Sequence, residues 1–246
     1  MEGFFFGKYK MDFTEPKKIH LENNQGLFLA GSDEVGRGCL AGPVVAATVI
    51  FTSSQNKMPE LFNILKGLGV TDSKKITRSK RRSILSKLDI SFDSLQQNIK
   101  YNNNEFSFSL CQQSPKEIDK INILQASLLS MKNSFKLCWD KKSKGIWMID
   151  GNKVPDFDEL LVNKKSVIKG DTKSLLIGLA SVIAKEYRDN LMEKLGNIYP
   201  GYGIEQNAGY PTKLHKDAIK VLGVTPIHRL SFRGVKEYII PSERLY

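Results

Sequence analysis

The stretch LFLAGSDEVGRGCLAGPVVAATVIF, residues 27–51, decides how the chain is organised. Residues 27–30 and residues 44–51 are two apolar runs, and Gly42 and Pro43 come directly before the second. Apolar runs of this length bounded by glycine or proline predict buried β-strands. We expect the two strands to pair as a hairpin-like unit, with the residues between them forming the connecting loop.

Two adjacent carboxylates, Asp33 and Glu34, lie where the first strand passes into this loop. Neighbouring side chains on a strand point to opposite faces, so we expect the two to converge only because the strand ends there. Carboxylates with no histidine or cysteine nearby are the hard oxygen ligands that Mg²⁺ or Mn²⁺ prefers. The pair therefore predicts part of a divalent-metal site. For the pair alone, a surface position before a flexible loop is the alternative.

An arginine between two glycines follows the acids, as Gly36, Arg37 and Gly38. Glycine takes backbone conformations that are closed to other residues and lets a ligand approach the backbone closely. An arginine guanidinium matches the geometry of a phosphate. The segment therefore predicts a phosphate site beside the metal site.

Two more carboxylates follow predicted strands later in the chain. Asp150 comes directly after the apolar run 146–149, and Asp171 follows residues 167–170 just before a predicted helix. Acids from several strand ends of an α/β sheet can meet at one edge. Two divalent ions held by such a cluster clamp the reacting oxygens in phosphodiester cleavage. Taken singly, Asp150 is better explained as a turn former and Asp171 as an acid at a helix N-terminus.

The charge of the chain points to a polyanionic partner. Its 246 residues include 37 Lys and Arg against 26 Asp and Glu, for a formal net charge of +11. This balance indicates binding to nucleic acid or to an anionic membrane surface. No apolar run is long enough to span a membrane, and the N-terminus lacks the features of a signal peptide. We therefore expect a cytoplasmic, monomeric protein with no membrane partner.

The apolar pattern predicts one α/β domain. Strands are expected at residues 27–30, 44–51, 106–112, 146–149 and 166–168, and helices at residues 77–88, 115–138 and 174–195, with a shorter helix after Thr212. This order predicts a mixed sheet flanked by helices, with a small C-terminal helical portion. We divide the chain into a leader, residues 1–25, expected to be flexible, a domain over residues 26–235 and a tail, residues 236–246.

Eight motifs, in one order, resemble those of the ribonuclease HII family from about residue 26 to residue 232. They are GSDEVGRGCLAGPVVAA (31–47), TDSKK (71–75), EIDKINILQASLLSMK (117–132), MIDGN (148–152), VIKGD (167–171), ASVIAKEYRD (180–189), GYPTKLH (209–215) and TPIHRLSF (225–232). The resemblance implies the ribonuclease H fold, with residues 26–235 as a ribonuclease H-like catalytic domain. It also implies a Mg²⁺- or Mn²⁺-dependent endonuclease that cleaves RNA in RNA-DNA hybrids and at single ribonucleotides embedded in duplex DNA. Water attack 5′ to the ribonucleotide would leave a 5′-phosphate and a 3′-hydroxyl.

The resemblance also assigns roles to residues of this sequence. The catalytic, metal-binding acids that it implies are Asp33, Glu34, Asp150 and Asp171. The loop that inspects the 2′-hydroxyl at the RNA-to-DNA junction is implied to be Gly36, Arg37 and Gly38. Tyr210 matches the family tyrosine that packs against the sugar on the DNA side, and simple packing is the alternative for it.

Four basic residues are further candidates for substrate contact. Lys74 and Lys75 lie in a family motif, and we expect them to contact phosphates. For the basic residues at 78–82 we expect a solvated helix face. Lys185 and Arg188 lie three positions apart on a predicted helix and therefore share a face. From that face they would approach the substrate backbone or pair with nearby acids.

His215 and His228 lie in family motifs but match no metal-ligand spacing, and we expect structural roles for them. Asp189 lies about five turns along a helix from Asp171. The two acids therefore cannot occupy the same ligand position, and the resemblance assigns the catalytic role to Asp171.

Two other interpretations of the sequence remain open. Ribonuclease HIII shares the acids but carries an added N-terminal domain and a different residue at the centre of the glycine loop, and Arg37 fits ribonuclease HII better. The charge alone would also suit a non-catalytic nucleic-acid-binding module. Four acids at strand ends oppose that module, because they would repel phosphate unless metal ions neutralised them.

Overall fold

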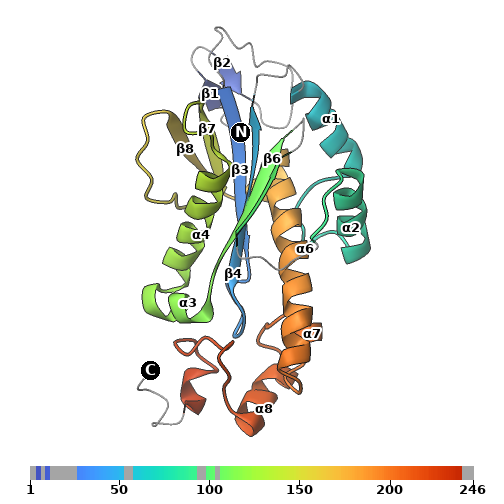
Figure 1. Ribbon diagram of the computed structural model, residues 1–246, viewed down its shortest axis with the longest axis vertical. Helices are drawn as coiled ribbons and strands as arrows, with labels where there is room; N and C mark the ends of the chain where they lie inside the picture. The colour runs from blue at the N-terminus through green and yellow to red at the C-terminus, as the bar shows by residue number, and fades with distance from the viewer. Residues whose placement is uncertain are drawn as a thin grey trace.

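The computed structural model of the chain describes residues 4–6, 9–11, 27–52, 58–92, 98–102 and 106–239. A six-stranded mixed sheet forms the centre, with the strand order β5-β6-β4-β3-β7-β8. Helix α4 covers one face of this sheet and helix α6 covers the other, while α7 and α8 form a smaller helical end below the sheet (Figure 1). The predicted α/β architecture is therefore confirmed, including the C-terminal helical portion.

The strands of the sheet are β3 (Leu27–Val35), β4 (Val44–Thr52), β5 (Asn98–Asn102), β6 (Ser107–Gln113), β7 (Lys144–Asp150) and β8 (Val162–Val167). β3 and β4 pair antiparallel, as the hairpin-like pattern predicts. β3 pairs parallel with β7, and β7 pairs parallel with β8. The carboxyl ends of these three neighbouring strands therefore lie at one edge of the sheet.

The helices are α1 (Met58–Leu68), α2 (Arg78–Lys87), α3 (Pro115–Ile121), α4 (Ile123–Cys138), α5 (Gly170–Lys173), α6 (Leu175–Ile198), α7 (Ile204–Asn207) and α8 (Lys213–Leu222), followed by a 3-10 turn at Lys236–Tyr238.

Strand β3 is buried on both faces and contributes side chains to two hydrophobic cores. Leu29 packs in the core that includes α6, whereas Phe28 and Ala30 pack with Phe135 of α4. This alternation is the two-residue period of a strand between two helical layers.

Helix α6 approaches β3 closely because Gly31 has no side chain. A Cβ at Gly31 would lie 2.5 Å from the backbone nitrogen of Ile177 and 2.6 Å from the backbone carbon of Leu176. The contact brings the first turns of α6 against the strand that carries Asp33. Gly31 thus fixes the distance between the acidic end of β3 and the helix beside it.

Several elements differ from the expectations. The helix predicted at residues 115–138 is broken at Asn122, which has a positive φ of 67° and caps α4 by accepting a hydrogen bond from the Gln125 amide. Helix α1 and strand β5 have no counterpart among the predicted elements. Within the leader, β1 (Phe4–Phe6) pairs antiparallel with β2 (Tyr9–Met11). The remaining leader residues and residues 240–246 of the tail lie outside the described residues.

Within the described ranges, no helix combines the length and the apolar character needed to cross a membrane.

The close approach at Gly31 predicts a specific loss of stability. Gly31→Ala should lower the free energy of unfolding by about 1 to 3 kcal/mol, because the added methyl overpacks a backbone contact. The matched control is Gly67→Ala in α1, where a Cβ meets nothing within 4 Å. That exposed substitution should leave stability equal or raise it by up to about 1 kcal/mol. Equal denaturant midpoints for wild type and Gly31→Ala would show that the helix does not depend on this glycine.

Candidate active site

The carboxyl edge of β3, β7 and β8 brings acids together. Asp33 and Glu34 lie within the last three residues of β3, Asp150 is the last residue of β7, and Asp171 lies in the one-turn helix α5 after β8. The first strand continues through both acids to Val35, whereas the sequence predicts that it gives way to the loop at Asp33. The acid-bearing segments still meet at one edge, because their strands are parallel neighbours.

The acids interact electrostatically in a largely buried site. Burial, reinforced by the charges of Glu34 and Asp150, raises the pKa of Asp33 well above its usual range. Burial also raises the pKa of Glu34 to about 7. Burial and the charges of Asp72 and Asp150 raise the pKa of Asp171. Asp33, Glu34 and Asp171 are therefore costly to ionise where they lie, and a positive charge among them would lower that cost.

The donor chemistry of this cluster fits a divalent cation. All four groups are carboxylates, the ligands that Mg²⁺ and Mn²⁺ prefer, and burial, with the charges of neighbouring acids added to it, raises the pKa values of three of them. In this conformation, no three His, Cys, Asp or Glu side chains of the described residues converge as a ready ligand set. The fit is therefore one of ligand type and charge.

Lys74 lies close to the acids. Its partial burial lowers the pKa of the ammonium, but the charges of Asp33 and Asp72 outweigh this effect and raise it. The Lys74 amide donates to Asp72 Oδ1 at 2.9 Å. This hydrogen bond holds the turn at residues 71–75, which carries the lysine beside the site. Lys75 is exposed, and its amide donates to the Asp72 carbonyl at 2.9 Å.

Two buried serines, which the sequence does not mark as functional, join this turn to the acids. Ser73 Oγ lies 2.8 Å from Ser181 Oγ on α6. The Ser181 side chain also hydrogen-bonds the Asp33 carboxylate. Both serines lie within motifs of the chain, but small polar residues carry no signal of burial in a sequence. They fix Asp33 between β3, α6 and the 71–75 turn.

Asp150 is held by the segment that carries Asp171. The Gly170 amide donates to Asp150 Oδ1 at 2.7 Å. A Cβ at Gly170 would lie 2.6 Å from Ile177 Cδ1 and 3.2 Å from Asp150 Oδ1. A larger residue here would have to displace the Ile177 side-chain end and crowd the Asp150 carboxylate.

The glycine loop begins directly after the acids. Gly36 has a positive φ of 93°, and Arg37 and Gly38 are exposed. The Arg37 guanidinium donates to Glu34 Oε1 at 3.2 Å. The backbone carbonyls of Gly36 and Arg37 point inward and accept hydrogen bonds from the buried side chain of Arg229, a residue that the sequence does not single out. The loop thus presents its outer side to solvent beside the acids.

Lys185 and Arg188 do not share the surface position that the sequence suggests. Lys185 Nζ lies 2.6 Å from Asp189 Oδ1, which is one of its two expected roles. Arg188 is fully buried and donates to the carbonyls of Pro43 at 3.0 Å, Ala208 at 2.8 Å and Ala41 at 3.2 Å. Arg188 therefore does not contact a substrate from this position, because its buried guanidinium is bound to three backbone carbonyls inside the fold.

The basic residues of α2 are not a freely solvated face either. Arg81 is buried, and its guanidinium lies 2.7 Å from Asp189 Oδ2. Arg82 lies 2.8 Å from Glu186 Oε1 on α6. These ion pairs join α2 to α6. They also engage Asp189 away from the four acids.

Tyr210 is positioned by a pair of buried histidines. His215 Nδ1 lies 2.9 Å from the Tyr210 carbonyl, and His215 Nε2 lies 3.2 Å from His228 Nε2. The Thr225 amide donates to His228 Nδ1 at 3.0 Å. His228 Nδ1 must then be unprotonated, so His228 donates through Nε2 and His215 donates through Nδ1 to Tyr210. Both histidines therefore have structural roles. Together they form a chain of neutral hydrogen-bond donors that holds the turn at Tyr210.

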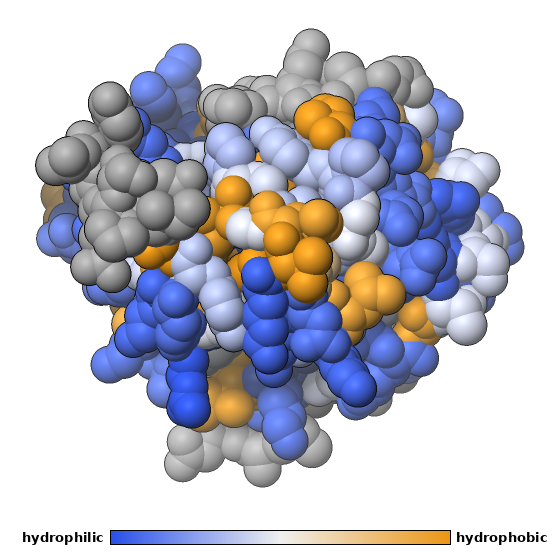
Figure 2. All heavy atoms as spheres, turned by 90° about the horizontal axis from the view of Figure 1, so that it is seen from below, coloured by the Kyte–Doolittle hydropathy of each residue, from blue (hydrophilic) through white to orange (hydrophobic). Residues whose placement is uncertain are grey.

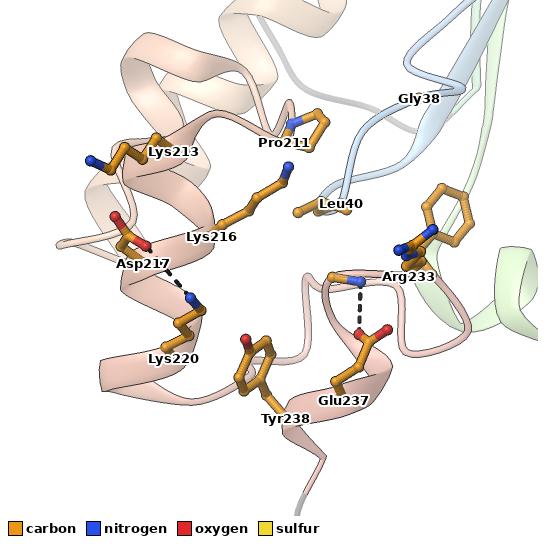
Figure 3. Close-up of a pocket in the computed structure, with 12 residues that line it drawn as sticks. Gly38, Leu40, Pro211, Lys213, Lys216, Asp217, Lys220, Arg233, Glu237 and Tyr238 are labelled. Carbon is orange, nitrogen blue, oxygen red and sulfur yellow. Dashed lines mark hydrogen bonds and ion pairs between the residues drawn. The ribbon is translucent and has the colours of Figure 1, made fainter.

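A basic groove continues from the glycine loop across the C-terminal end of the molecule (Figure 3). It encloses about 860 Å³ between Gly38, Leu40, helix α8 and residues 232–238. Its cationic side chains are Lys213, Lys216, Lys220 and Arg233, set against Asp217 and Glu237. Lys216 points into the groove toward Leu40 and Pro211. Seen from this end, hydrophilic side chains surround a small apolar patch (Figure 2), and α8 exposes Leu214, Val221 and Leu222.

Comparison with known proteins gives consistent results. The profile of the family described as Ribonuclease HII matches residues 30–235. A ribonuclease HII of Ruegeria pomeroyi is 41% identical over 211 residues, which cover 86% of this chain and 78% of that protein. The ribonuclease H2 structure from Pyrococcus horikoshii OT3 has a TM-score of 0.60 at 25% identity, covering 87% of this chain and 96% of that one. Bst-RNase HIII, solved in complex with Mn²⁺, has a TM-score of 0.62 at 16% identity, covering 87% and 69%, and shows a shared fold alone.

The histidine pair predicts a pH dependence of stability. Burial and the neighbouring His215 lower the pKa of His228 from 6.5 to about 4. The unfolded chain therefore takes up a proton at higher pH than the folded protein, and acid favours unfolding. Between pH 6.5 and pH 4 this site should remove about 3 kcal/mol of stability.

The measurement is denaturant unfolding of wild type and His228→Gln across this pH range. Subtracting the two curves cancels the titration of groups that do not interact with His228, so the difference reports on the histidine pair. The wild-type advantage should shrink steadily as the pH falls. A difference that stays constant from pH 6.5 to pH 4 would show that His228 is not held neutral.

Proposed function

Since this chain belongs to the ribonuclease HII family, we propose that it is a metal-dependent endoribonuclease that cleaves the RNA strand of RNA-DNA hybrids and nicks 5′ of single ribonucleotides in duplex DNA. Membership of the family makes it a ribonuclease H-type nuclease, a hydrolase of phosphodiester bonds. One observation carries the finer proposal. Carboxylates at one edge of the sheet, with Asp33 buried and the other three partly buried, adjoin an exposed glycine loop whose backbone is free to meet a sugar.

The acids would supply the metal site. Asp33, Glu34, Asp150 and Asp171 would hold Mg²⁺ or Mn²⁺, and the Mn²⁺ complex of a ribonuclease HIII of the same fold supports that choice. Such ions activate a water molecule and stabilise the leaving oxygen of a phosphodiester. Ser181 and the Gly170 amide hold Asp33 and Asp150 at this edge of the sheet, and the carboxylates would converge on the ion as it binds.

The remaining residues of the site would bind and orient the substrate. Lys74 lies near the acids and would approach the phosphate to be cleaved. The loop at residues 36–38 would read the 2′-hydroxyl, the group that distinguishes RNA from DNA. Tyr210, held through its carbonyl by His215, would pack against the next sugar on the DNA side.

The basic groove would hold the duplex beyond the junction. It begins at Gly38 and at Pro211, the residue after Tyr210, so a strand leaving the glycine loop would pass along α8. Lys213 and Lys216 are exposed there and would neutralise phosphates. The reaction would leave a 5′-phosphate on the ribonucleotide and a 3′-hydroxyl on the nucleotide that precedes it in the same strand.

The direct assay uses a labelled DNA duplex that contains one ribonucleotide, incubated with Mg²⁺ or Mn²⁺. Wild type should nick 5′ of the ribonucleotide. Asp150→Asn should reduce the rate by at least about a thousandfold, because it removes a charge needed to hold metal, while binding to the duplex persists. Nicking of an all-DNA duplex at the same rate, or an active Asp150→Asn enzyme, would refute the proposal.

The groove predicts a change in the salt dependence of binding. The double variant Lys213→Ala/Lys216→Ala should lower the slope of log affinity against log salt concentration by roughly 1 to 2, because each lysine would neutralise about one phosphate. Lys144→Ala is the control, because Lys144 is exposed at the amino-terminal end of β7, opposite the acids. A slope that changes equally in both proteins would place the duplex elsewhere.

A further inference from the structure

Arg229 is a fully buried arginine whose side chain donates hydrogen bonds to the backbone of the glycine loop. Its Nη2 donates to the Gly36 carbonyl at 2.7 Å, its Nη1 to the Arg37 carbonyl at 2.9 Å and its Nε to the Gly42 carbonyl at 3.0 Å. No carboxylate of the described residues forms an ion pair with it. A buried charge that has hydrogen bonds to backbone carbonyls but no carboxylate beside it is costly. The burial of Arg229 is therefore not explained by stability alone.

The geometry of the peptide bond turns this contact into an orientation of the loop. A trans peptide is planar, with its C=O and N–H pointing in opposite directions. Since Arg229 holds the carbonyls of Gly36 and Arg37 inward, the amides of Arg37 and Gly38 must point outward. Neither amide donates to an acceptor among the described residues, and both residues are exposed. Two consecutive free donors of this kind form a small concave site for an oxygen atom.

Arg229 is itself held firmly. Its own amide donates to the Leu40 carbonyl at 2.8 Å, and its guanidinium lies 5.1 Å from the centre of the Phe232 ring. The next two amides, those of Leu230 and Ser231, donate to the Asp119 carboxylate on α3, each at 2.8 Å. The loop orientation therefore depends on a contact between Arg229 and Gly36, which are 193 residues apart in sequence.

From these contacts we propose that Arg229 is a positioning residue for substrate selection: by holding the carbonyls of Gly36 and Arg37 inward, it aims the amides of Arg37 and Gly38 at the 2′-hydroxyl of the ribonucleotide. The proposal rests on the proposed function, because it assigns the reading of the sugar to this loop. Arginine is required since its planar fork spans two carbonyls at once, whereas the lysine ammonium is a single point of charge.

The first test measures selectivity of binding, so that cleavage does not interfere. In an Asp150→Asn background, affinity is compared for a DNA duplex with one ribonucleotide and for the same duplex without it. Arg229→Gln should reduce the ratio of the two affinities by about tenfold or more, because the hydrogen bonds to the sugar are no longer well aimed. Arg229→Lys, which keeps the charge and can serve one carbonyl, should give an intermediate ratio.

A matched control separates positioning from general destabilisation. Arg78 donates to Glu186 Oε1 at 3.2 Å and to Asn190 Oδ1 at 2.7 Å on α6, and none of its hydrogen bonds reaches the loop. Arg78→Gln should lower the melting temperature but leave the affinity ratio at the wild-type value. If folded Arg229→Gln and Arg229→Lys both keep that ratio, Arg229 is not a positioning residue.

A second measurement needs no Arg229 variant to fold. In the Asp150→Asn protein, amide hydrogen exchange of Arg37 and Gly38 should be fast in the free state. Adding the ribonucleotide duplex should slow it by about tenfold or more, and the all-DNA duplex should not. Slow exchange in the free protein, or equal protection by both duplexes, would overturn the inference.

The outcomes also separate this inference from the proposed function. If the protein without an Arg229 substitution shows no preference for the ribonucleotide duplex and no nicking, the proposed function fails. If it nicks and discriminates while the Arg229 variants discriminate equally well, only the role of Arg229 fails.

Discussion

The cost of ionising carboxylates that are removed from water and lie beside one another, at the carboxyl edge of β3, β7 and β8, is the constraint on which the site depends. Parallel pairing brings Asp33 and Asp150 to the same edge, and the fold then holds them there with contacts that do not remove their charge. Gly31 lets α6 approach and place Ser181 beside Asp33, while the Gly170 amide donates to Asp150. The folded protein thus keeps carboxylates that are costly to ionise, and a divalent cation would lower that cost.

The glycine loop adjoins this edge but is held by different means. The two fully buried arginines, Arg188 and Arg229, donate to six backbone carbonyls in all, five of them between Gly36 and Pro43. A Cβ at Gly36 would overlap Arg188 Nε, so the loop packs on this arginine because position 36 is a glycine. The acids and the glycine loop, to which we assign chemistry and selectivity, are therefore adjacent residues of one segment with separate supporting contacts.

The sequence predicts the sheet and the position of the acids at its edge well, because apolar runs followed by acids are local patterns. It predicts the rest of the site poorly, because the supporting contacts are between distant segments. Arg188 resembles a helix-surface arginine, and nothing local marks Arg229 as buried, since their acceptors are loop carbonyls 20 to 193 residues away. The break at Asn122 is hidden by helical spacing on both sides, and the start of β8 is masked by Lys164 and Lys165, which suit an edge strand.

In the proposed site, four carboxylates bind the metal while the amides of Arg37 and Gly38 meet the sugar. Anomalous diffraction from crystals of the protein with Mn²⁺ and a duplex containing one ribonucleotide tests both parts at once. We expect Mn²⁺ among Asp33, Glu34, Asp150 and Asp171, with the 2′-hydroxyl against the loop amides. Mn²⁺ held by other residues, or a 2′-hydroxyl that faces away from residues 36–38, would contradict this assignment.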